Sequence, residues 1–215
     1  MKLIAEQADA IAAEAMARMY RDPFWEARFG DRGRVFARED GLHHLGYLGA
    51  ALEADDPGVL ERYAVWLRSV LVARGMCSLQ IVENFARIAE LLAARGLDQD
   101  GRAQDFLRAA GAALAYREGP AAFDAAAVAR EALAGPPATT GASPRELELL
   151  LAYLADSLAA ARPELFQRHL AWAEPYLAAR GTSLPALLAA LRAPLARASP
   201  GAARLLDGTP CPPSS

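Results

Sequence analysis

Asp40 and His44 are the pair of residues whose types and spacing could do chemistry. They stand four positions apart in a stretch with helical periodicity, which places both side chains on one face of a helix. A carboxylate at that spacing can hold an imidazole in one tautomer or as the imidazolium ion. Three uses fit such a pair: a clamp on the pyrrole nitrogens of a tetrapyrrole, part of a metal site, and a surface ion pair.

The remaining histidines and cysteines do not complete a metal site. His43 points about 100° away from His44 around the helix, so the two do not chelate one ion. Cys77 and Cys211 form neither a metal quartet nor a disulfide framework. The sequence therefore predicts no metal centre, while haem ligation by His44, with His169 as the second distant imidazole, stays open as an alternative.

Aromatic and basic residues flank the pair. Tyr47, Tyr63 and Trp66 would form the aromatic wall of any cavity between the two helices that carry them. Arg34 and Arg38 precede the acidic residue and could reach the carboxylates of a ligand. The alternative is that the tryptophans are core anchors.

Catalytic machinery is not visible. The sequence has no glycine-rich phosphate loop after a strand, no nucleophile elbow, and no Ser or Cys with a base at readable spacing. We therefore predict that the protein is not an enzyme.

A helix pair recurs within the chain. Residues 47–75 align without gaps to residues 153–181 at an offset of 106, with eleven identities in 29 positions that include a Trp and a terminal Arg-Gly. We interpret this as an internal duplication. The copies differ where His44 is matched by Leu150. A polar ring beside an apolar helix face needs a hydrogen-bond partner or costs about 1–3 kcal/mol, so a ligand, a side chain or water must satisfy it.

Bulk composition limits the classes of partner. With 215 residues, 53% of them hydrophobic, the chain can bury a core. A net charge of −3 argues against nucleic acid as a direct partner. No apolar run reaches the roughly 20 residues that cross a bilayer, and the first residues do not resemble a signal peptide, so we expect a cytoplasmic protein without a membrane partner.

Helical periodicity runs through the chain, and no segment alternates with period two. We predict an all-α fold of about nine helices in two duplicated bundles. The predicted domains are residues 1–98, a ligand-binding bundle, residues 99–198, a related bundle that begins its repeat with a capping box at Ser143, and residues 199–215, a flexible tail. The clearest linker is 135–141.

Three glycines interrupt the predicted helix 32–54, namely Gly41, Gly46 and Gly49. Each costs about 1 kcal/mol relative to Ala in a helix interior. They favour close approach of a neighbouring backbone or of a flat ligand, and compositional drift is the alternative.

An acidic residue, a His four later, Tyr-Leu, a Pro-led helix with Tyr and Trp, and an Arg-Gly end make up a longer pattern. Here these are Asp40, His44, Tyr47-Leu48, Pro57, Tyr63, Trp66 and Arg74-Gly75. The pattern resembles the helical region upstream of the cobalamin-binding module in bacterial cobalamin proteins and in the photocobilins, which add a bilin to a cobalamin photoreceptor. The resemblance covers about residues 1–96 and implies a helical bundle with a tetrapyrrole pocket.

Cobalamin itself is not expected. The Asp-x-His-x-x-Gly loop of the cobalamin module is missing, because Gly41 stands where its Asp should be and His43 to Gly46 lie in mid-helix. The Trp followed by Glu-His that contacts cobalamin in such proteins is absent after Trp66 and after Trp172.

The first hypothesis is therefore a cytoplasmic photosensory protein that binds biliverdin or a related bilin in its first bundle. Asp40 and His44 would contact the pyrrole nitrogens, the three aromatic residues would stack, and the arginines would hold the propionates. The alternatives are a cofactor-free helical module for protein interaction or dimerisation, and a carrier of haem or another apolar ligand. A homodimer or a downstream signalling protein is the expected protein partner.

Overall fold

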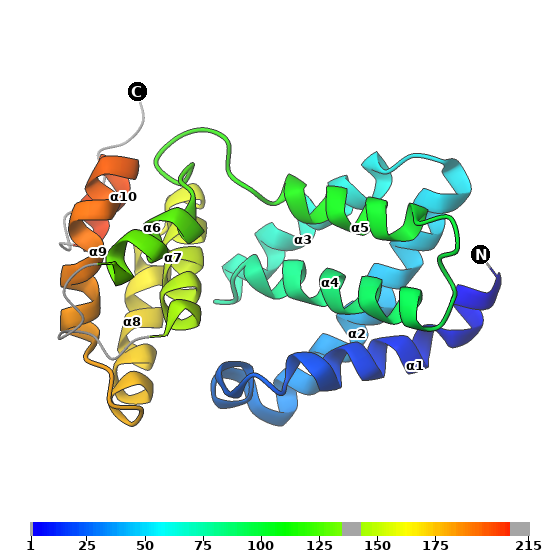
Figure 1. Cartoon of the computed structure of the whole chain (residues 1–215), viewed down its shortest axis with the longest axis horizontal. Helices are drawn as coiled ribbons and strands as arrows, with labels where there is room; N and C mark the ends of the chain where they lie inside the picture. The colour runs from blue at the N-terminus through cyan, green and yellow to red at the C-terminus, as the bar shows by residue number, and fades with distance from the viewer. Residues whose placement is uncertain (1, 135–142, 207–215) are drawn as a thin grey trace. The chain divides into compact units, whose positions relative to one another are not determined.

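A computed structural model describes residues 2–134 and 143–206. Within these ranges the chain is all-helical and has no strand, which confirms the predicted fold class (Figure 1). No helix in this part of the chain is both long and apolar enough to cross a membrane. The ten helices described are α1 (Lys2–Met19), α2 (Pro23–Ala54), α3 (Gly58–Ala73), α4 (Leu79–Ala94), α5 (Arg102–Ala113), α6 (Ala125–Leu133), α7 (Pro144–Ala159), α8 (Pro163–Ala178), α9 (Leu184–Ala198) and α10 (Pro200–Leu206).

Short polar side chains begin several of these helices. The Asp22 side chain accepts a hydrogen bond from the Phe24 amide at the start of α2. Ser143 and Glu146 form the predicted capping box at the start of α7, each side chain accepting from the backbone amide of the other. Such caps stabilise a helix by about 1 kcal/mol, which is why local sequence locates these helix starts well.

Helix α2 is longer than the predicted helix 32–54, because the segment from Pro23 to Phe29 joins it across a break. The break is at Gly30, whose φ of 53° and ψ of −151° are open to glycine but strained for other residues. Further along, Gly41 allows close packing, since a Cβ added there would lie 3.1 Å from the Cβ of Ala12 in α1. The glycine at 41 therefore serves the approach of a neighbouring helix.

The chain divides into two compact units. The first comprises Met1–Arg68 and Leu79–Leu114, and the second comprises Ser69–Ser78 and Ala115–Ser215. The predicted boundary after residue 98 is too early, because α5 packs on α4 and α2 within the first unit.

The predicted tail from residue 199 also needs correction. Residues Pro200–Leu206 form α10, which buries Ala202, Leu205 and Leu206. Residues 207–215 and the predicted linker 135–141 lie outside the described residues.

In the first unit, α1 packs along α2 and α4, and α5 packs on α4 and α2. The core contains fully buried large side chains from five helices, among them Ile11, Leu48, Leu60, Phe85, Ile88 and Leu107. Each such side chain contributes about 1.5–3 kcal/mol by leaving water. This packing positions α2, and the buried side chains of Leu60 and Tyr63 anchor α3. These two helices carry the candidate site residues.

Four helix pairings of the first unit have counterparts in the second unit. Helix α6 packs on α7 and α9, and α10 packs on α9 and α7, as α1 does on α2 and α4 and as α5 does on α4 and α2. Its core includes Leu147, Leu151, Phe166, Leu187 and Leu191.

Backbone geometry also recurs at the 106-residue offset. Asp55 and Ala161 are the two non-glycine residues with positive φ in the described chain, at 52° and 53°. Gly75 and Gly181 have φ of 84° and 76°, and each lies in the turn after the second helix of its repeat. The sequence match therefore extends to the turns, where helical composition alone would not produce it.

Candidate binding site

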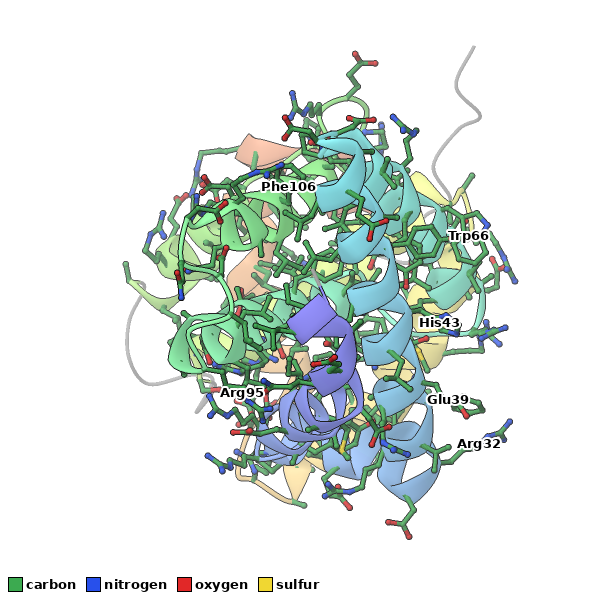
Figure 2. All side chains as sticks on the ribbon, turned by 90° about the vertical axis from the view of Figure 1, so that its right-hand side faces the viewer. Arg32, Glu39, His43, Trp66, Arg95 and Phe106 are labelled. Carbon is green, nitrogen blue, oxygen red and sulfur yellow. The ribbon has the colours of Figure 1, made fainter. Side chains whose placement is uncertain are left out.

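An open hollow lies on the first unit where α2 and α3 meet. It has a volume of about 430 Å³ and is lined by Tyr47 from α2 and by Val59, Arg62, Tyr63 and Trp66 from α3. Figure 2 shows Trp66 at the periphery of the molecule. The structure thus brings together the three aromatic residues that the sequence singled out.

The rings in this hollow are stacked and partly bare. The centroids of the Tyr47 and Tyr63 rings are 3.9 Å apart and their planes differ by 15°. The Trp66 ring follows at 6.1 Å from Tyr63, tilted by 35°. Tyr47 is 43% exposed and Trp66 is 58% exposed. Large aromatic surfaces of this kind gain free energy when another flat group covers them.

His44 lies behind this stack and does not line the hollow. Its side chain is only 2% exposed, and its Nδ1 atom is 2.8 Å from the Tyr63 hydroxyl oxygen. The edge of the Phe85 ring packs against it from α4, with the centroids 4.8 Å apart. The hydrogen-bond partner that a buried imidazole requires is therefore a side chain of the protein.

Burial and, to a smaller extent, the charge of the neighbouring His43 together lower the pKa of His44 from 6.5 to about 3. The imidazole is therefore neutral at pH 7. Burial also raises the pKa of Tyr63, with the negative charge of Asp40 and the neighbouring Tyr47 adding to it, so the phenol keeps its proton. The pair is uncharged on both sides of its hydrogen bond.

The lowered pKa of His44 is opposite to what a carboxylate holding an imidazolium ion would produce. The side chain of Asp40 is half-buried, and its charge raises the pKa of Tyr63 and of Tyr20. The pKa of His44 is instead determined by burial and by His43. The arrangement therefore differs from a carboxylate holding an imidazolium ion.

The two predicted arginines are engaged elsewhere. Arg34 pairs with Glu26 and lies over the Tyr20 ring at 4.8 Å. Arg38 pairs with Asp9 of α1 at 2.5 Å.

Arg62 takes their place at the hollow. Its guanidinium is 3.3 Å from the Asp56 carboxylate, and both side chains are largely exposed. Sequence reasoning missed Arg62 and Val59, although each stands one helical turn before an aromatic residue of the wall, Trp66 and Tyr63 respectively.

A larger hollow of the first unit, of about 510 Å³, lies between the start of α1 and the turn before α5. Its polar groups have structural roles. The Asp98 carboxylate accepts hydrogen bonds from the amides of Ala103 and Gln104 at the start of α5. Arg102 pairs with Asp55. This hollow is the weaker candidate for a binding site, because its polar groups already stabilise the helix ends.

Among the described residues, no group of three or more His, Cys, Asp or Glu side chains is placed to hold a metal ion. Cys77 is buried, and Cys211 lies outside the described ranges.

Comparison with known proteins adds no family. No protein-family model, no curated protein and no solved structure matches this chain.

Proposed function

We propose that the protein is a non-catalytic binding protein whose first unit takes a flat, conjugated ligand of the open-chain tetrapyrrole class, such as biliverdin, in the hollow between α2 and α3. The observation that carries the proposal is the stack of Tyr47 on Tyr63 beside the exposed Trp66. The volume of the hollow, about 430 Å³, is within the range of about 300–1,000 Å³ found for small-molecule sites.

The lining residues divide the work of binding. Tyr47 and Trp66 offer ring faces to the pigment, and Arg62 offers a cation to a propionate group. Arg62 can leave Asp56 at little cost, because exposed ion pairs contribute at most about 1 kcal/mol. His44 acts as a positioning residue that holds Tyr63 by its hydroxyl.

A bound bilin would absorb visible light, and the proposal therefore includes the photosensory role expected from the sequence. The cytoplasmic location expected from the sequence is also part of the proposal. The internal duplication belongs to the proposal as well. It is supported by the positive φ angles that recur at the 106-residue offset.

The test is a visible absorption spectrum of the full chain after incubation with biliverdin, with haemin and cobalamin in parallel. We expect a shifted biliverdin band in the wild type and its loss in Trp66→Ala. Trp172→Ala changes the matched residue of the second unit and is the control that should keep the band. An unchanged biliverdin spectrum in the wild type would reject the proposal, and a shifted haemin band alone would favour the haem carrier.

A second candidate function is a cofactor-free module for protein interaction. It is favoured by exposed apolar side chains on the same two helices, namely Val35, Phe36 and Leu42 on α2 and Val65 and Trp66 on α3. The charged residues Arg32 and Glu39 of α2 lie along the same edge of the view as Trp66 in Figure 2.

Analytical ultracentrifugation separates the two candidates. An interaction module that dimerises would sediment as a dimer in the wild type and as a monomer in Trp66→Ala, with no biliverdin band in either. A ligand-binding protein would show the band, and Trp66→Ala would not change its sedimentation.

A further inference from the structure

The second unit contains a longer series of rings than the first. Tyr153 stacks on His169, with centroids 3.7 Å apart and planes within 10°. Trp172 follows at 6.1 Å from His169, and Tyr176 stacks on Trp172 at 5.0 Å with planes within 21°. The guanidinium of Arg180 then lies over the Tyr176 ring at 5.4 Å.

The first unit has the matched series up to its tryptophan. At the 106-residue offset, Tyr47, Tyr63 and Trp66 correspond to Tyr153, His169 and Trp172, and the two ring-to-tryptophan distances are both 6.1 Å. The position one helical turn later differs between the two sequence repeats, because Val70 stands in the first repeat where the second repeat has Tyr176. A valine has no ring to stack on the tryptophan one turn earlier.

The matched aromatic side chains of the two repeats also differ in exposure. Trp66 and Tyr47 are exposed, whereas Trp172 is half-buried and Tyr153 is buried. In the second repeat Tyr176 thus stacks on the tryptophan, whereas the matched Trp66 is 58% exposed.

We infer that the second unit carries a second site for flat conjugated ligands, in which Tyr176 is the built-in occupant stacked on Trp172. This inference rests on the proposed function of the first unit. It attributes the different exposure of Trp66 and Trp172 to one position, which is 70 in the first repeat and 176 in the second.

Arg180 holds the Tyr176 ring in place through two contacts of its guanidinium group. It covers the Tyr176 ring, and its Nε atom donates to the Glu146 carboxylate at 3.1 Å. Glu146 is itself held by the capping box of α7. The side chain that covers Trp172 is therefore fastened to the start of the neighbouring helix.

The test exchanges the two residues in the full chain and measures the binding stoichiometry with biliverdin as the probe. Tyr176→Val introduces the residue that the first repeat has and should raise the stoichiometry from one to two. Val70→Tyr should lower the affinity of the first site at least tenfold, because the new ring can stack on Trp66 one helical turn away. Combining Tyr176→Val with Trp66→Ala isolates the second site and should leave a stoichiometry of one.

The outcomes separate the two proposals. If the wild type binds no biliverdin, the proposed function fails and this inference fails with it. If the wild type binds one equivalent and Tyr176→Val also binds one, the inference alone is wrong. Tyr176→Leu, which retains more apolar volume, should give the same stoichiometry of two, and a thermal melt of each variant checks that the second unit stays folded.

Discussion

The Nδ1 atom of His44 on α2 lies 2.8 Å from the hydroxyl oxygen of Tyr63 on α3, and both side chains are buried. This hydrogen bond joins the helix that carries Tyr47 to the helix that carries Trp66. It therefore fixes the ring at the centre of the stack without placing a charge there. The matched positions in the second unit are Leu150 and His169, so the polar pair is confined to the first unit.

Removing both partners of this pair should cost less than the sum of the two single removals. His44→Leu and Tyr63→Phe each leave a buried polar group without its partner, at an expected cost of about 1–3 kcal/mol in the free energy of unfolding. In the double variant neither group remains, so the cost should be less than the sum of the two. Urea denaturation of the four proteins measures this as a coupling energy, and strict additivity would show that the hydrogen bond contributes nothing.

Acid should destabilise the first unit through His44. The pKa of its imidazole is lowered by burial from 6.5 to about 3, so between these pH values the unfolded chain binds a proton that the folded chain does not. The contribution of the neutral imidazole to the free energy of unfolding is therefore fully present above about pH 6.5. Below that pH the free energy of unfolding falls by up to about 1.4 kcal/mol for each pH unit, until about pH 3.

Urea midpoints between pH 7 and pH 4 measure this effect, with His44→Leu as the comparison. The variant cannot take up this proton, so its stability should fall less steeply with acid. Equal slopes in the two proteins would assign the acid sensitivity to other groups.

Much of the fold follows from local sequence. Caps such as Ser143 and terminal glycines such as Gly75 and Gly181 are readable one residue at a time. Helical periodicity predicts helices at 146–161, 163–180 and 184–198, and those observed begin and end within about two residues of these bounds. Helix α10 was missed because its seven residues carry too short a pattern to show periodicity, and its three buried side chains depend on packing against α9 and α7.

The sequence predicted the part of the candidate site that two consecutive helices form. Tyr47, Tyr63 and Trp66 meet because α2 and α3 are adjacent in sequence and in space. The choice of Arg62 over Arg34 and Arg38 depends on α1 and on the start of α2, whose Asp9 and Glu26 bind the other two arginines. A pattern along one helix contains no information about these partners.

Two glycines of α2 should respond in opposite directions to the same change. In Gly41→Ala the new Cβ would lie 3.1 Å from the Cβ and 3.3 Å from the Cα of Ala12, so the helices must move apart, at an expected net cost of about 1–2 kcal/mol. In Gly46→Ala the new Cβ meets nothing within 4 Å, so helix propensity should stabilise the protein by about 0.5–1 kcal/mol. Thermal denaturation distinguishes them, and a stabilised Gly41→Ala would contradict the close packing of α1 on α2.

Loss of the Asp156 carboxylate should destabilise the second unit. This carboxylate is buried and accepts hydrogen bonds of 2.6 Å from the Ser78 amide and from the Tyr116 hydroxyl. It thereby fastens the segment 69–78 to α7 within that unit. Asp156→Ala removes two hydrogen bonds to a charged acceptor, and because such bonds contribute about 1.5–3 kcal/mol each, we expect a loss of at least 3 kcal/mol.

Hydrogen exchange at the Ser78 amide provides the local measurement. The amide should exchange much faster in Asp156→Ala than in the wild type, while Asp156→Asn, which keeps one oxygen acceptor, should fall between them. Tyr116→Phe removes the hydroxyl partner alone and should leave the Ser78 amide protected. Equal exchange in the wild type and in Asp156→Ala would show that the segment is held by its apolar contacts, with the carboxylate contributing only to the packing of α7.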